Sequence, residues 1–600
     1  MSAYHTRSKD FPPARAPFLL AALLAGVSAM PAAAQQQPAP AAQPGEGAED
    51  AKLKALFHAS DEASLKRQPL MALFRGDMRY ADQLGEYYTD AFIAVEKAAN
   101  AADLAALQTI DRAKLTTVNQ IAYDVFEADQ LRTQKGFDDR ILAVSKYLPI
   151  DHFTGFQAFY PDFASGQGAA PFKTVADYEI GLFREGMKRG IVQPKLVVTN
   201  MIGQFDNLIA QGVEESVFYG PVKKFPEGIS TADQARLKTA YAAQVHDVIL
   251  PAHQKIRDFL ATEYLPAARD SVGTSALPGG AALYAYAIES NTTLPLTADY
   301  VHDLGLSEVK RILTEMEAQK AKVGFKGTLQ DFFTHLRTEK RFQPESADAL
   351  RMGYEAIGKR VDARIGEQFS LLPKTPLEIR PVPAYREKTD AAGSYSSGTP
   401  DGSRPGVFYF NTYDLPTRYT WGMETLYLHE GAPGHHFQIS LAQENAALPA
   451  FMRFGGNTAY VEGWALYAET LHDELGVAVE PYQRMGGLND EMLRAMRLVV
   501  DSGLHAKGWS REKAIDYMVT NSPMSRTDAV AEVERYIAMP GQALAYKIGQ
   551  LTILKAKAKA KAALGAKFDP RGFHAAVLDT GALPMPVLEK KIDDWVAGVK

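Results

Sequence analysis

The sequence has 600 residues, of which 46% are hydrophobic, and it carries a formal net charge of -6. This length and composition suffice to bury a large core in one or a few domains, and the mildly acidic balance without a basic block argues against nucleic acid as a partner. The absence of cysteine excludes disulfides, a cysteine nucleophile and thiolate metal sites, so any metal site must use His, Asp or Glu.

The first 34 residues have the pattern of an export signal. Three basic residues precede the apolar stretch 16–30 (APFLLAALLAGVSAM), and Ala32–Ala34 fit a small-residue cleavage site. The alternative is an uncleaved anchor, but the apolar run is shorter than the ~20 residues that span a bilayer. We therefore expect a signal peptide at 1–34 and a periplasmic or secreted mature protein without membrane contact.

A Pro/Gln/Ala-rich stretch follows, for which we predict a disordered linker at 35–50. A helical domain is predicted for 51–600, because apolar residues recur at helical spacing over most of this range. Between 375 and 419, LEIRPVPAY and VFYFNT have the pattern of short strands, and GSYSSGTPDGSRPG between them has the pattern of a loop. Helices are predicted again from Trp421, so the expected fold is mainly α-helical, with a deep cleft and a small sheet beside the next helix.

Residues 429–436 have the sequence HEGAPGHH and hold three of the chain's 13 histidines. In the H-E-x-x-H zinc motif, two histidines four apart bind the metal and the Glu acts on the attacking water. Here the fourth residue after His429 is Pro433, which has no ligand atom. On an unbroken helix, a histidine seven residues on would lie about 10.5 Å along the axis, too far to share an ion. We therefore expect the Pro-Gly pair to break the helix and bring His435 or His436 back beside His429.

A third ligand is expected downstream, on the amphipathic helix of NTAYVEGWALYAETLHDEL. Glu462 and Glu469 are seven residues apart and share a face of this helix. Burying Glu462 among apolar neighbours without a cation would be costly, and a metal ion supplies that cation. Glu469 could then hold a ligand histidine in place. Taken singly, each of these residues could be an ordinary surface or core group, but their combination favours a metal site.

Several stretches together resemble one family. DGSRPGVFYFNT, HEGAPGHHFQ, EGWALYAE, DSGLHAKGWS and RYIAMPGQALAYKIGQ are similar to the bacterial proteins grouped as domain of unknown function 885, relatives of the gluzincin metallopeptidases. The resemblance covers residues 55–600 and implies a zincin-like domain with its catalytic motifs in 393–550. The family pattern H-E-x-x-P-G-H favours His435 over His436 as the second ligand and implies one zinc per chain, with manganese or cobalt as alternatives. His436 would then lie just outside the ligands.

Other residues are candidates for catalysis. Glu430 is the candidate general base for a metal-activated water. The intermediate of peptide hydrolysis needs a hydrogen-bond donor, for which we consider Tyr536, Tyr546 and His505. Lys547 could bind a peptide carboxylate. The alternative is that these last four residues have structural roles. The tyrosines and the lysine would then belong to packed helices, with the lysine solvated, and the histidine would bond to an acidic neighbour.

VFYFNT is a candidate edge strand that pairs with an extended substrate. Tyr409 lies on this strand, and Tyr395 and Arg404 in the preceding loop could also contact substrate. A plain hairpin edge is the alternative.

These observations predict an exported zinc-dependent peptidase that hydrolyses short peptides. The alternatives are a metal-dependent amidase that acts on non-peptide or cell-wall amides, and a non-catalytic periplasmic peptide-binding protein. The presence of Glu430 argues against the last alternative, because binding alone needs no base.

Overall fold

The computed structural model describes residues 45–600, except 76, 81, 82, 84, 86, 88, 160–170, 384–386, 388–390 and 479. The predicted signal peptide and most of the predicted linker lie outside these residues. The end of the linker prediction is wrong, because α1 (Ala48–Arg67) begins before residue 51. Asp50 in the first turn of α1 is buried and accepts hydrogen bonds from Thr116 and Asn119, which tie this turn to the start of α4.

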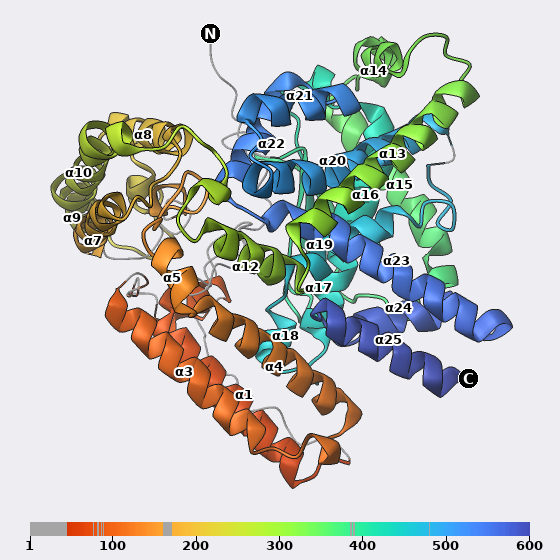
Figure 1. Ribbon diagram of the computed structural model, residues 1–600, viewed down its shortest axis with the longest axis horizontal. Coiled ribbons are helices and arrows are strands. Elements are labelled where there is room, and N and C mark those ends of the chain that lie inside the picture. The colour runs from red at the N-terminus through yellow and green to blue at the C-terminus, as the bar shows by residue number, and fades with distance from the viewer. Residues whose placement is uncertain are drawn as a thin grey trace.

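The described part of the chain before residue 375 is mainly helical, as predicted. In Figure 1, α1, α3 and α4 form an elongated bundle, and α7 to α10 form a lobe at the left of the view. The longer helices are α3 (Asp90–Gln108), α4 (Thr117–Gly136), α7 (Pro171–Lys188), α8 (Lys195–Ala210), α9 (Thr231–Gln244), α10 (Leu250–Phe259), α12 (Gly280–Thr292), α13 (Ala298–Lys322), α14 (Leu329–Thr338) and α15 (Ala347–Gln368).

A three-stranded sheet follows, in the order β1–β3–β2. β1 (Leu377–Pro381) is parallel to β3 (Gly406–Phe410), and β2 (Gly393–Ser396) is antiparallel to it. Two predictions are therefore wrong. The stretch that contains β2 was predicted as a loop, and the VFYFNT strand is central rather than an edge, because β3 has a partner on each side.

Helices resume close to the predicted position and continue to the C-terminus. They are α16 (Met423–Glu430), α17 (His435–Glu444), α18 (Ala450–Arg453), α19 (Thr458–Glu469), α20 (Pro481–Ala506), α21 (Arg511–Asn521), α22 (Arg526–Ala538), α23 (Ala545–Leu564), α24 (Pro570–Leu578) and α25 (Met585–Val599). The expected mainly α-helical fold with one small sheet is thus confirmed.

Two large hydrophobic clusters hold these elements together. One surrounds α20 and joins it to α7, α8, α10, α13 and α22. The other surrounds α19 and joins it to α1, α4, α15, β3, α16 and α23–α25. The short helix α16 packs on both α19 and α20, so the HEGAPGHH segment begins where the two clusters meet.

Helix α19 is held in place at its start and along one face. The Asn457 side chain accepts a hydrogen bond from the backbone N–H of Tyr460 and fixes where the helix begins. Gly463 lets α23 approach closely, because a Cβ there would lie 2.5 Å from the Cα of Gly549. These contacts fix the position of Glu462. Within the described residues, no helix is both long enough and apolar enough to cross a bilayer.

Candidate metal centre

The HEGAPGHH segment breaks between two helices, as predicted. α16 and α17 flank a turn at 431–434. Gly434 is required there, because a Cβ at this position would lie 1.9 Å from the carbonyl oxygen of His429. The indole N–H of Trp464 on α19 donates to the Pro433 carbonyl at 2.8 Å. The turn is therefore held against both the end of α16 and the helix that carries Glu462.

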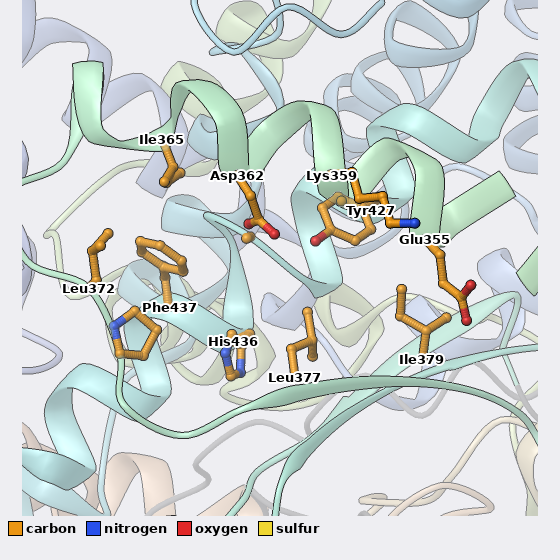
Figure 2. A pocket seen from close by; sticks show the side chains of 13 residues that line it. Glu355, Lys359, Asp362, Ile365, Leu372, Leu377, Ile379, Tyr427, His436 and Phe437 are labelled. Carbon is orange, nitrogen blue, oxygen red and sulfur yellow. The ribbon is translucent and has the colours of Figure 1, made fainter. Parts of the chain in front are cut away.

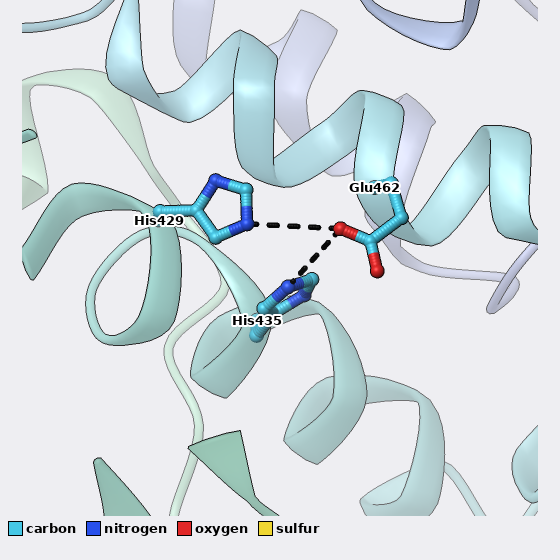
Figure 3. Close-up of side chains that lie close together, drawn as sticks. All are labelled: His429, His435 and Glu462. Carbon is cyan, nitrogen blue, oxygen red and sulfur yellow. Dashed lines mark ion pairs between the residues drawn. The ribbon is translucent and has the colours of Figure 1, made fainter. Parts of the chain in front are cut away.

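The three residues predicted as metal ligands converge (Figure 3). The Nε2 atoms of His429 and His435 lie 3.6 and 3.5 Å from the same carboxylate oxygen, Oε2 of Glu462. All three side chains are buried, and their ligand atoms lie within 4.8 Å of one another. In a tetrahedral zinc site with bonds of about 2.1 Å, neighbouring ligand atoms lie about 3.4 Å apart. The donor set and its spacing therefore suit a metal ion, and we call these residues the His–His–Glu cluster.

Glu469 contacts the first histidine from behind, as predicted. Its Oε1 lies 2.7 Å from Nδ1 of His429, and its Oε2 accepts a hydrogen bond from the Thr425 hydroxyl at 3.1 Å. Burial lowers the pKa of His429, but its bonds with Glu462 and Glu469 outweigh this effect and raise the pKa to about 10. The carboxylates thus favour a positive charge at this position, which a metal ion would also supply.

The second histidine lacks such an anchor. Nδ1 of His435 is buried, and no hydrogen-bond partner for it occurs among the residues that the structure describes. The two histidines of the His–His–Glu cluster are therefore held differently, one by a carboxylate and one by the position of α17 alone.

Glu430, the candidate base, is the last residue of α16 and is 8% exposed. Its charge contributes to the raised pKa of His429. Burial raises the pKa of the Tyr354 hydroxyl on α15, and the charge of Glu430 raises it further. The charge of Glu430 thus acts on both the first histidine and the tyrosine of α15.

Sequence reasoning missed a group of polar residues around this site. Burial raises the pKa of Asp490 on α20 to about 6, and the charges of Glu469 and His429 also act on this carboxyl. The charges of Asp490 and Arg418 both act on the hydroxyl of Tyr354. No motif marks Tyr354, Arg418 or Asp490, because they come from three separate segments that only the fold brings together.

His436 is predicted to lie just outside the metal ligands, but its imidazole contacts β2 instead. Its Nδ1 lies 3.1 Å from the hydroxyl of Tyr395 on β2, and burial lowers the pKa of the imidazole to about 4. Tyr395, predicted to contact substrate, is therefore hydrogen-bonded to the protein. We find no contact that joins either residue to the His–His–Glu cluster within the described part of the chain.

Two of the other residues predicted near the substrate, Arg404 and Tyr409, are not buried. Arg404 is exposed in the turn between β2 and β3. Phe408 and Phe410 pack on Tyr354 of α15, and alternate residues of a strand point to opposite faces. Tyr409 therefore points to the other face of the sheet, away from α15, and this geometry does not favour the prediction that it binds substrate.

Lys547 is a buried ion-pair residue rather than a free cation. Its side chain is 0% exposed, and Nζ lies 2.7 Å from Glu491, 2.9 Å from Glu308 and 2.8 Å from Oε1 of Gln550. The three protons of the ammonium group thus have acceptors within the protein, so the geometry argues against binding of a substrate carboxylate.

His505 has a structural environment. It is buried, its Nδ1 accepts a hydrogen bond from the backbone N–H of Thr274 at 3.1 Å, and its Nε2 lies 2.9 Å from the carbonyl oxygen of Tyr536. Because a carbonyl accepts only, Nε2 carries the proton and points it at the backbone. This proton is not directed at a substrate, so the predicted donor role loses its support.

The two tyrosines considered as donors lie beside Arg497 of α20. The Tyr536 hydroxyl donates to Glu532 and accepts from Nε of Arg497 at 3.2 Å. The guanidinium of Arg497 lies 4.5 Å from the ring centre of Tyr546. These contacts do not test whether either tyrosine takes part in catalysis, so that role stays a prediction.

Comparison with known proteins places the chain in a family. Residues 69–592 match the family described as "Bacterial protein of unknown function (DUF885)", and no curated protein matches the chain. One similar solved structure is described as "the putative lipoprotein from Colwellia psychrerythraea"; it is 28% identical and aligns over 92% of this chain and 100% of that chain with a TM-score of 0.84.

A second solved structure shows the same fold. It is described as "a putative lipoprotein of unknown function from Shewanella oneidensis", is 19% identical, and aligns over 90% of this chain and 99% of that chain with a TM-score of 0.67. The family match spans most of the sequence, which confirms the resemblance at this level. The chain belongs to the bacterial family DUF885.

Proposed function

We propose that this protein is an exported, gluzincin-like metallopeptidase that hydrolyses short peptides in a deep cleft, with one zinc ion per chain held by the His–His–Glu cluster. The observation that supports this proposal most is the convergence of two imidazole Nε2 atoms on one oxygen of Glu462, at 3.6 and 3.5 Å. A cluster of this kind with Glu430 beside it has the donor set of a hydrolytic metal site.

The residues of the chain have distinct tasks in this proposal. A bound zinc ion supplies a Lewis acid that activates water and polarises a carbonyl. Glu430 takes the proton from the attacking water and delivers it to the leaving nitrogen. Glu469 accepts a hydrogen bond from Nδ1–H of His429, so that Nε2 keeps its lone pair for the metal. The buried surroundings strengthen each of these electrostatic contacts.

Export is part of the same proposal. The first 34 residues have the pattern of a signal peptide, and the two similar structures are both described as putative lipoproteins. This sequence contains no cysteine to carry a lipid, so we infer release into the periplasm or medium rather than lipid anchoring.

Elemental analysis of the purified mature protein tests the metal site, and the adjacent histidines provide a matched pair. We expect about one zinc ion per chain in the wild type and in His436→Ala, and loss of the metal in His435→Ala. His436 is the control because it is buried like His435 but contacts Tyr395. Retention of zinc by His435→Ala would contradict the proposed ligand set.

Glu430→Gln tests the chemistry separately. This variant should keep the metal and lose hydrolysis of short peptides by about 10²- to 10⁴-fold, because the amide cannot accept a proton. The measurement is a screen of a peptide panel with zinc-loaded protein, with Glu367→Gln on the exposed side of α15 as the control. Full activity of Glu430→Gln, or a zinc-loaded wild type that cleaves no peptide, would contradict the proposed reaction.

A further inference from the structure

A cavity of 440 Å³ is lined in part by residues of the HEGAPGHH segment and its neighbour Phe437, but by none of the three residues proposed as metal ligands. It is open to solvent and is lined by residues of α15, β1 and the segment around His436 (Figure 2). Its volume falls within the ~300–1,000 Å³ of small-molecule sites. The cavity is therefore large enough for a ligand and is separate from the cluster assigned to the metal.

Two opposite charges of α15 face this cavity without partners. Lys359 and Asp362 are three residues apart, a spacing at which such side chains commonly pair, yet neither forms an ion pair or hydrogen bond within the described part of the chain. Other charges of the same helix pair locally, as Arg351 does with Glu355 at 2.6 Å. These two side chains are thus available to a ligand.

The hydroxyl of Tyr427 adds a third polar group. Figure 2 shows it pointing toward Asp362, and no hydrogen bond to it occurs among the described residues. Asp362 remains accessible to solvent, but the protein around its carboxyl is enough to raise its pKa. A carboxylate without a counter-ion in such surroundings favours a cationic group.

Apart from Glu355, which pairs with Arg351, and His436, the rest of the cavity wall is mainly apolar. Leu377 and Ile379 project from β1, and Phe437 projects from the first turn of α17. Leu372 lies at the wall and is 52% exposed, which is unusual for a large aliphatic side chain. The wall thus offers aliphatic and aromatic contacts opposite the charged face of α15.

We propose that this cavity binds a free α-amino acid with an aliphatic side chain, such as leucine. Asp362 and the Tyr427 hydroxyl would bind the ammonium group, Lys359 would bind the carboxylate, and Leu377, Ile379 and Phe437 would contact the side chain. The two charges are one helical turn apart, with Cβ atoms about 5–6 Å from each other. This separation suits the adjacent ammonium and carboxylate of one amino acid better than the distant termini of a peptide. The proposal requires no metal and goes beyond the proposed hydrolysis.

The test is equilibrium dialysis of radiolabelled L-leucine against the mature protein, with a chelator present so that a bound metal cannot hold the ligand. Unlabelled N-acetyl-leucine, leucinamide and glycine lack the ammonium, the carboxylate and the side chain, respectively. Each should compete at least about tenfold more weakly than leucine, because each leaves one face of the cavity without its partner. 3-Methylbutylamine, which has the ammonium and side chain only, should also be weaker.

Variants locate the site. Asp362→Asn and Lys359→Met should each weaken leucine binding about tenfold or more, because each removes a charge-assisted contact. Glu367→Gln, on the same helix but outside the cavity, and His435→Ala should bind like the wild type. Thermal unfolding of every variant checks that the fold is intact, and the two cavity substitutions are independent of each other.

Three results would overturn the proposal. The first is an absence of leucine binding at millimolar concentration by the folded wild type. The second is equal competition by 3-methylbutylamine, which would indicate a site for simple amines. The third is leucine binding that His435→Ala abolishes and Asp362→Asn leaves unchanged, which would place the ligand at the metal site.

Discussion

Glu462 of the His–His–Glu cluster and Lys547 of a second, ion-pair cluster lie on helices α19 and α23, which pack closely. Both clusters bury charged side chains. In the Lys547 cluster, each ammonium proton has an acceptor on the protein, from Glu491, Glu308 or Gln550. In the His–His–Glu cluster, two imidazole nitrogens and a carboxylate oxygen point at one another at about the distances that a shared ion would require.

This difference separates two kinds of buried polar group. A group that is satisfied within the protein stabilises the fold and has no bonding capacity left for a ligand. A group whose lone pairs converge with those of its neighbours gains most when a cation binds. The two clusters should therefore respond in opposite ways to substitution, the first by losing stability and the second by losing metal.

Lys547→Met should have the largest effect on stability. Among the described residues, it leaves Glu308 and Glu491 with Arg311 as their one cationic partner, and breaking a buried ion pair costs about 3–5 kcal/mol. We expect the free energy of unfolding of metal-free protein to fall by about 3 kcal/mol in denaturant titrations, with zinc content unchanged. Lys555→Met is the control, because the pair of Lys555 with Glu589 is exposed and should change stability by less than about 1 kcal/mol. A variant of normal stability that loses affinity for peptides would contradict this assignment and support the prediction that Lys547 binds substrate.

Glu469→Gln should produce the opposite pattern. Substitution of a partner behind a metal ligand weakens metal affinity about 10- to 100-fold, which corresponds to about 1.4–2.7 kcal/mol. The glutamine can still accept a hydrogen bond from Nδ1 of His429, and Glu462 still faces its Nε2, so we expect the metal-free protein to lose less stability than Lys547→Met does. Competition with a fluorescent zinc chelator measures the affinity. Unchanged zinc affinity together with a large loss of stability would assign Glu469 to the fold and would end the contrast between the two clusters.

The convergence of His429, His435 and Glu462 could be predicted because it depends on short stretches. A proline four residues after His429 and the glycine that follows it require a helix break, whatever the rest of the chain does. Glu462 and Glu469 share a face of α19 because they are seven residues apart on one helix. The long helices could be predicted for the same reason, because the spacing of their apolar residues can be read within each stretch of sequence.

The predictions that the fold contradicts, and those that its contacts do not favour, concern contacts between distant segments. The residues of β2 are mainly Gly and Ser, which have weak strand propensity, and this strand forms by pairing with β3. The partners of Lys547 come from α13 and α20, and the hydrogen bond to Nδ1 of His505 comes from Thr274. No local pattern distinguishes a buried lysine with acceptors from a solvated one. The sequence alone therefore allows Lys547 and His505 to act on a substrate, and only the fold shows their partners.

A third prediction extends the comparison to single histidines, with a smaller effect. His574 is buried, its Nδ1 donates to the Gln368 carbonyl at 2.7 Å, and its Nε2 lies 2.7 Å from the Tyr467 hydroxyl. Burial lowers the pKa of His574 to about 3, whereas the carboxylates around His429 raise the pKa of that histidine to about 10. His574 is therefore neutral in the folded protein and belongs with the groups that the protein satisfies internally.

The sign of the pH effect follows from this lowered pKa. In the unfolded chain the pKa of His574 is about 6.5, so below that pH the unfolded state binds more protons than the folded state. The contribution of His574 to stability is then complete above pH 6.5 and is lost as the pH falls toward 3. Between pH 7 and 5.5 this loss amounts to about 1 kcal/mol.

Denaturant titrations of the wild type and His574→Gln should show this loss as a shallower pH dependence in the variant. Burial also lowers the pKa of His253, to about 4, so the difference between the two proteins is the relevant quantity. Equal pH slopes would mean that folding leaves the pKa of His574 unshifted, which would contradict the assignment of His574 as a neutral, internally satisfied group.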